Sequence, residues 1–63
     1  MTEEEFAWMQ KLAPAVDMHW NEITDWEKHF AEDILERCRI YGRRTNVSPK
    51  QWEIITRISE KVL

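Results

Sequence analysis

The chain has 63 residues, a formal net charge of −3, one cysteine and four tryptophans. Its length predicts a single small domain over residues 1–63 that buries only about 60% of the surface its unfolded form exposes, and the lone cysteine excludes an intrachain disulfide. No apolar run approaches the ~20 residues of a membrane span, and the acidic start MTEEEF is unlike a secretory signal peptide, so we expect a cytoplasmic protein that does not enter a membrane.

The first predicted helix covers about residues 3–13. Thr2 with Glu5 three residues later forms a capping box, and acidic residues in the first turn suit the positive end of a helix. The apolar residues fall in two adjacent rows, Phe6, Met9 and Ala13 in one and Trp8 and Leu12 in the other. Pro14 should end or kink this helix because proline removes an intrahelical hydrogen bond. We therefore expect a connector between Pro14 and the second helix.

The second predicted helix is the longest and covers about residues 20–41. Apolar residues recur at the intervals of three and four that are typical of a helix, namely Trp20, Ile23, Trp26, Phe30, Ile34, Cys38 and Tyr41. The start of the helix stays open, since Asp17, Asn21 and Thr24 are each suitable caps. Gly42 stands where a residue with positive φ would close the helix.

The third predicted helix covers about residues 49–62. Its start is indicated by an N-cap, a proline in the first turn, a capping box and a hydrophobic staple, formed by Ser48, Pro49, Gln51, Val47 and Trp52. Its buried stripe is Trp52, Ile55, Ile58 and Val62. No stretch alternates with the period of a half-buried strand.

The sequence therefore predicts an all-α fold, a small bundle of two helices, or of three if the first helix docks. The long central helix should pack antiparallel to the C-terminal helix. Trp26 and Trp52 lie on the apolar stripes, so we expect them in the core. Two helices of this size do not easily bury four indoles, and tryptophan is enriched at binding hot spots. Trp8 and Trp20 are therefore candidate interface residues.

No catalytic, cofactor-binding or metal-binding motif is found. His19, His29 and Cys38 are spaced too widely for the close ligand pairs of a zinc site. Cys38 lies on the apolar stripe, which favours a buried structural thiol over a nucleophile. A glycine-rich phosphate loop and a nucleophile elbow are both absent from the sequence. We therefore expect a protein that is not an enzyme and needs no cofactor.

Charge divides unevenly along the chain. Residues 1–36 hold ten acidic and two basic residues and carry −8, whereas residues 37–63 hold seven basic and two acidic residues and carry +5. Such asymmetry favours a charged partner. The candidate residues for binding a partner or a phosphate are Arg39, Arg43, Arg44 and Lys50.

The basic hairpin at residues 37–50 has three interpretations. In the first, Arg37 and Arg39 stabilise the end of the second helix, and Arg43 and Arg44 keep the loop soluble. In the second, the basic residues contact a protein or another acidic partner. In the third, they contact nucleic-acid phosphates. Glu53 and Glu60 on the third helix, together with the acidic chain as a whole, argue against direct reading of DNA by that helix.

Residues 26–62 resemble a helical hairpin found in small proteins of bacteriophages and mobile elements. The resemblance rests on W-x3-F-x3-I from Trp26, on YG from Tyr41, on SPKQ from Ser48 and on I-x2-I from Ile55. This chain departs from those proteins in the loop, where it has Val47 and they tend to carry leucine or a similar residue before the serine. Such hairpins often accompany proteins of DNA replication or recombination. The resemblance implies a phage-type accessory protein of a bacterial host's cytoplasm that works by binding, and it carries over no catalytic residue.

Together these observations predict a non-enzymatic protein that docks on a protein partner, as an adaptor or inhibitor of a component of nucleic-acid metabolism. In this hypothesis the acidic face of the first two helices meets a basic surface. The alternative is a DNA- or RNA-binding protein that contacts phosphates through the basic hairpin. A third hypothesis is a homodimer formed through exposed tryptophan and isoleucine faces.

Overall fold

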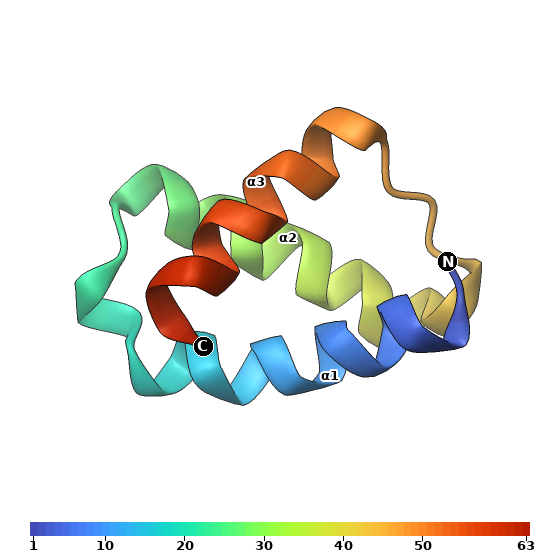
Figure 1. Ribbon diagram of the computed structural model, residues 1–63, viewed down its shortest axis with the longest axis horizontal. Coiled ribbons are helices and arrows are strands. Elements are labelled where there is room, and N and C mark those ends of the chain that lie inside the picture. The colour runs from blue at the N-terminus through green and yellow to red at the C-terminus, as the bar shows by residue number, and fades with distance from the viewer.

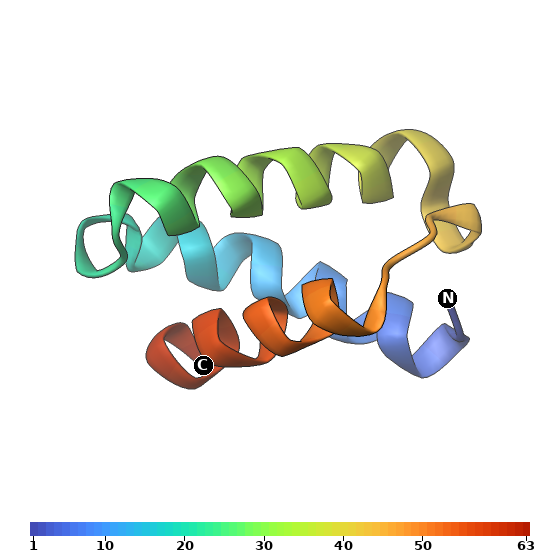
Figure 2. The ribbon, with the colours of Figure 1, turned by 90° about the horizontal axis from the view of Figure 1, so that it is seen from above.

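The computed structural model describes residues 1–63, which form three α-helices and two short 3₁₀ turns. In chain order these are α1 (Glu3–Met18), η1 (Trp20–Glu22), α2 (Asp25–Tyr41), η2 (Gly42–Arg44) and α3 (Pro49–Val62). Helices α2 and α3 run in opposite directions, and α1 packs against both of them (Figures 1 and 2). The predicted all-α bundle is confirmed, and its first helix docks. No helix in it is both long and apolar enough to cross a membrane.

Each α-helix begins with the same local motif. In all three capping boxes the N-cap hydroxyl accepts a hydrogen bond from the backbone N–H three residues on, and that residue's side chain accepts one from the N-cap N–H. The pairs are Thr2 with Glu5, Thr24 with Glu27, and Ser48 with Gln51. Of the three candidate caps for the second helix, Thr24 is the one that is used.

The predicted end of the first helix is wrong. Helix α1 continues through Pro14 to Met18, four residues beyond the proline. Val16, in the extra turn, is buried in the core, while Pro14 itself faces solvent. Burying an aliphatic side chain gains about 1.5–3 kcal/mol, which offsets much of the cost of about 3 kcal/mol of a proline within a helix.

The predicted start of the second helix is also wrong. Residues 20–22 form the separate turn η1, and α2 begins only at Asp25. Between them Ile23 has an extended backbone, with φ −109° and ψ 158°, and its side chain is buried. The break lets Ile23 enter the core from a connector and leaves Thr24 free to cap α2.

The hydrophobic core draws on all three helices and on the connector before α2. Its ten buried residues are Met9, Leu12, Val16, Ile23, Ala31, Ile34, Cys38, Ile55, Ile58 and Val62. The predicted stripe of α3 is therefore confirmed at Ile55, Ile58 and Val62.

Trp26, predicted to lie in the core, is 60% exposed. Ile34 and Cys38 of the predicted stripe are buried, and Glu27 and Ala31 complete the buried side of α2. Trp26 is one residue, or about 100° of helix rotation, from Glu27, so it lies outside this buried side. Trp52, the other tryptophan expected in the core, is half-buried.

A buried carboxylate connects α2 to α3. The Glu27 oxygens lie 2.8 and 2.9 Å from the Lys61 ammonium nitrogen, and one of them also accepts the hydrogen bond from the Thr24 N–H. The hydrogen bond from Lys61, followed by the one from the Thr24 backbone, holds the pKa of Glu27 below its ordinary value. Glu27 therefore supports both the start of α2 and the docking of α3.

Gly42 ends α2 with φ +58° and ψ −135°. The positive φ agrees with the prediction, but this ψ lies outside the left-handed helical region, in a part of conformational space that glycine alone enters easily. The turn is completed by Thr45, whose hydroxyl donates hydrogen bonds to the carbonyls of Gly42 and Arg37 at 2.8 and 3.2 Å. These contacts fix the direction of the chain between α2 and α3.

Candidate functional site

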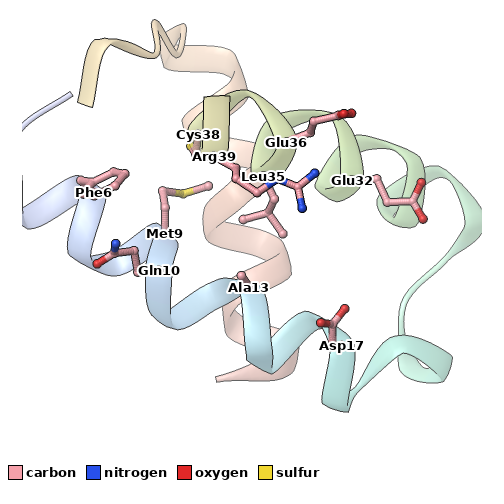
Figure 3. Close-up of a pocket in the computed structure, with 10 residues that line it drawn as sticks. All are labelled: Phe6, Met9, Gln10, Ala13, Asp17, Glu32, Leu35, Glu36, Cys38 and Arg39. Carbon is pink, nitrogen blue, oxygen red and sulfur yellow. The ribbon is translucent and has the colours of Figure 1, made fainter. Parts of the chain in front are cut away.

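An open groove of about 660 Å³ lies between α1 and α2 (Figure 3). The apolar residues that line it are Phe6, Met9 and Ala13 from α1 and Leu35 and Cys38 from α2. The first three are the apolar row predicted for the first helix. Met9 and Cys38 are buried, and the other three are half-buried, so the groove has an apolar floor within reach of solvent.

The polar rim of the groove is mostly acidic. Asp17 projects from the last turn of α1, while Glu32 and Glu36 project from α2, and all three are exposed. Asp17 and Glu32 lie at the same end of the groove, and Phe6 and Cys38 lie toward the other end, where Arg39 is the one basic group (Figure 3). The groove is therefore polarised along its length, from acidic to apolar.

None of the charged residues on this rim pairs with another residue of the chain. The five ion pairs of the protein join His19 to Glu22, Lys28 to Asp25, Arg37 to Asp33, Arg43 to Glu3 and Lys61 to Glu27. The three rim carboxylates and Arg39 take part in none of them, and in none of the side-chain hydrogen bonds. Their charges are therefore available to a ligand.

Cys38 contributes a neutral thiol to the floor of the groove. Burial raises the pKa of the Cys38 thiol above its ordinary value, although a hydrogen bond with Thr45 partly opposes this shift. A thiol of raised pKa stays protonated at neutral pH and is a poor nucleophile. Cys38 is buried, as its place on the apolar stripe predicted.

Two of the four basic candidates, Arg39 and Arg43, lie beside other parts of the chain. Arg39 lies on the rim of the acidic groove. The Arg43 guanidinium lies 2.9 Å from a Glu3 carboxylate oxygen, and the Arg43 carbonyl accepts a hydrogen bond of 2.7 Å from the Met1 ammonium group. These contacts connect the start of α1 to η2, so Arg43 acts within the fold.

The other two candidates, Arg44 and Lys50, are exposed. Arg44 borders a second, more polar hollow together with Arg37, Tyr41, Thr45 and Asn46. Lys50 lies in the first turn of α3, outside both hollows. The four candidates are neighbours in the sequence, but the structure places Arg39 and Arg44 in different concavities on different sides of α2.

The two tryptophans predicted as interface residues are half-buried and pack against the core. The Trp8 ring stacks on the Trp52 ring, with centroids 5.6 Å apart, and so joins α1 to α3. The Lys28 ammonium lies 5.5 Å from the centre of the Trp20 ring. The tryptophan that is most open to solvent is Trp26, which sequence reasoning had assigned to the core.

The structure brings together no group of three or more side chains suited to hold a metal ion. His19 contacts Glu22 within η1, and this exposed pair has no third ligand beside it. The acidic groove, in contrast, joins residues that are far apart in the sequence, which is why it is the leading candidate for a binding site.

Comparison with known proteins assigns no relationship. No protein-family model matches the chain, and no curated protein or solved structure matches it either.

Proposed function

We propose that this protein is a non-enzymatic binding module that receives a basic, amphipathic helix of a partner protein in the groove between α1 and α2. The observation that carries the proposal is the combination of an apolar floor with unpaired rim carboxylates. Grooves of this kind bind helices by taking up apolar anchors spaced at i, i+3 or i+4, and i+7.

The dimensions of the groove support a helical ligand. From Phe6 to Asp17 the α1 wall extends about 16 Å at 1.5 Å per residue, which matches about three turns of a bound helix. A partner helix bound in the groove, against α1 and α2, would bury the half-buried apolar residues between them, as neighbouring helices do in bundles.

The polarity of the groove supports one orientation of that ligand. Lysines or arginines at one end of the bound helix would lie near Asp17 and Glu32, and its apolar anchors would lie over Phe6 and Leu35. Charge complementarity of this kind fixes register and raises the association rate more than it raises affinity.

The class of partner is supported by the resemblance of residues 26–62 to hairpins of phage and mobile-element proteins. On that basis the partner is a component of nucleic-acid metabolism, and this chain acts on it as an adaptor or inhibitor.

A binding titration with two matched peptides tests the groove. We expect a fluorescently labelled Leu/Lys amphipathic helix to bind and its Leu/Glu counterpart not to bind. Replacing Ala13 with arginine places a long cationic side chain on the floor, so the dissociation constant should rise at least about tenfold, equivalent to about 1.4 kcal/mol. Ala7→Arg, at an exposed site on the same helix, is the matched control and should bind as the parent does.

The rim is tested by Glu32→Gln with Glu36→Gln, compared with Glu53→Gln and Glu60→Gln on α3, which change the net charge equally. Only the groove pair should weaken binding. Equal binding of both peptides, or no effect of Ala13→Arg in a chain of unchanged helicity, would contradict the proposal.

Direct binding of nucleic acid through the basic hairpin is the second candidate. It is favoured by Arg44, which has no carboxylate partner and shares a polar hollow with Arg37 and Tyr41. Phosphate contacts release counterions, so binding to labelled single-stranded or duplex DNA should weaken steeply as salt is raised. Anisotropy titrations at two salt concentrations measure this effect.

For this second candidate, the variant that combines Arg44→Gln and Lys50→Gln should lower the affinity and the salt dependence together. The matched control, Lys11→Gln with Arg57→Gln, removes the same charge from exposed sites elsewhere. Absence of DNA binding at low salt would leave the groove as the functional site.

A further inference from the structure

Helix α2 carries a second apolar surface that the groove does not use. It consists of Trp26, Phe30, Asp33, Arg37, Ile40 and Tyr41, which we call the outer stripe. Trp26, Ile40 and Tyr41 are 60%, 64% and 60% exposed, and they account for most of the large apolar side chains that α2 leaves in solvent. Exposed apolar surface concentrated on one face of a small protein is typical of an interaction site.

The outer stripe is one continuous face of the helix. At 100° per residue its six positions fall within an arc of about 100°. The Trp26 and Phe30 rings stack with centroids 5.7 Å apart, and an Asp33 oxygen lies 3.3 Å from an Arg37 nitrogen in the next turn. Glu32, Glu36 and Arg39 of the groove rim lie outside this arc, on the neighbouring side of α2, so the two surfaces share no residue.

The order of residues along the outer stripe is self-complementary. From the N-terminal end it reads aromatic, acidic, basic, apolar, with the ion pair in the middle. If a second α2 lies antiparallel across a two-fold axis at the level of Leu35, Asp33 faces Arg37 of the second copy. In the same register Phe30 lies at the level of Ile40 of the second copy.

Both kinds of contact in that register are favourable. The two ion pairs join opposite charges, and Phe30 and Ile40 bury apolar surface together. A two-fold interface makes each contact twice, which is the commonest way for identical chains to associate.

We infer that the outer stripe is a homodimer interface in which the α2 helices of two copies pack antiparallel. It leaves both grooves open, so it adds self-association to the proposed function and does not depend on it. Because the stripe occupies one helix, the interface belongs to the small class below about 1,200 Å², which is typical of transient contacts. Association should therefore depend on concentration.

Sedimentation equilibrium of the whole chain tests this inference. The mean mass should rise from the monomer value of 7.7 kDa toward twice that value as the concentration increases. Trp26→Lys, at an exposed position, should remain monomeric with unchanged helicity. The control Trp20→Phe lies outside the outer stripe and should associate as the parent does.

A charge exchange tests the register. Asp33→Arg gives one copy two basic side chains at the centre of the stripe, and Arg37→Asp gives another copy two acidic ones, so each variant alone should stay monomeric. An equal mixture of the two should form a heterodimer, because both central pairs again join opposite charges.

Three results would overturn the inference. They are a parent that stays monomeric at every concentration, a dimer that survives Trp26→Lys, and a mixture of the charge variants that fails to associate.

Discussion

Replacing Leu12 with alanine is expected to leave most of the chain unfolded at physiological temperature. Leu12 is 1% exposed and belongs to the core. Truncating a buried leucine to alanine costs about 2–5 kcal/mol, through lost transfer free energy and the cavity left behind. A core of this size supplies only about 3–5 kcal/mol of net stability. Thermal unfolding followed by far-ultraviolet circular dichroism should show the midpoint fall sharply or the cooperative transition disappear.

The matched control is Lys11→Ala, one position earlier on the same helix and exposed. It changes the helix by a similar truncation but removes nothing from the core, so its effect should stay within about 0.5 kcal/mol. If Leu12→Ala unfolded at the same temperature as this control, α1 would contribute nothing to the core, and its docking on α2 and α3 would be wrong.

Replacing Glu27 with alanine is expected to destabilise the fold by about 2 kcal/mol. The change removes the acceptor for the Thr24 N–H, and capping contacts are worth about 1 kcal/mol. It also removes the carboxylate that Lys61 contacts. Because the Lys61 side chain is 46% exposed, solvent screening lowers the contribution of that pair below the range of about 1.5–3 kcal/mol for charged hydrogen bonds, to about 1 kcal/mol. Chemical denaturation at neutral pH measures the sum.

The Glu27 contribution should also depend on pH in a defined direction. The pKa of Glu27 is lower in the folded chain than its ordinary value of 4.5. Its contribution to stability is therefore complete above about pH 4.5 and is lost as the pH falls through the lowered value. Glu27→Gln, which keeps a hydrogen-bond acceptor for Thr24 but cannot ionise, should lose less stability than the parent over this acidic range.

Glu60→Gln is the control for this titration, because Glu60 is exposed on α3 and forms no ion pair. Its stability should follow that of the parent as the pH is lowered. A Glu27→Gln variant whose acid sensitivity equalled the parent's would show that the buried carboxylate is not held ionised by Lys61.

The starts of the helices could be predicted because capping is a local interaction. Thr2 with Glu5 and Ser48 with Gln51 lie within four residues of each other, so the sequence alone displays the whole motif. The same motif at Thr24 and Glu27 was available and would have placed the start of α2 correctly.

The end of α1 could not be predicted in this way. Whether a helix passes a proline depends on what the following turn buries, and the burial of Val16 is settled by contacts with distant parts of the chain. The groove likewise depends on contacts between residues that are distant in the sequence. Its α1 row was visible as Phe6, Met9 and Ala13, but nothing in the sequence placed Asp17 beside Glu32.

The basic hairpin shows that residues close in the sequence can lie on different sides of the fold. Arg37 and Arg39 look like parts of one cluster in the sequence, yet residues two apart on a helix point to different sides. Arg37 accordingly pairs with Asp33, while Arg39 reaches the groove. Basic residues that are close together in the sequence are therefore farther apart in the structure than the sequence suggests.

The three capping boxes also bear on how this fold can diverge. Because the start of every helix is specified by its own residues, local preference and final structure agree, which favours rapid folding without competing arrangements. Ten core residues then suffice to join the helices. The charged groove rim and the outer stripe share no residue with these two sets, so point substitutions there should leave the scaffold intact. The proposed binding surfaces can therefore diverge independently of the residues that fold the chain.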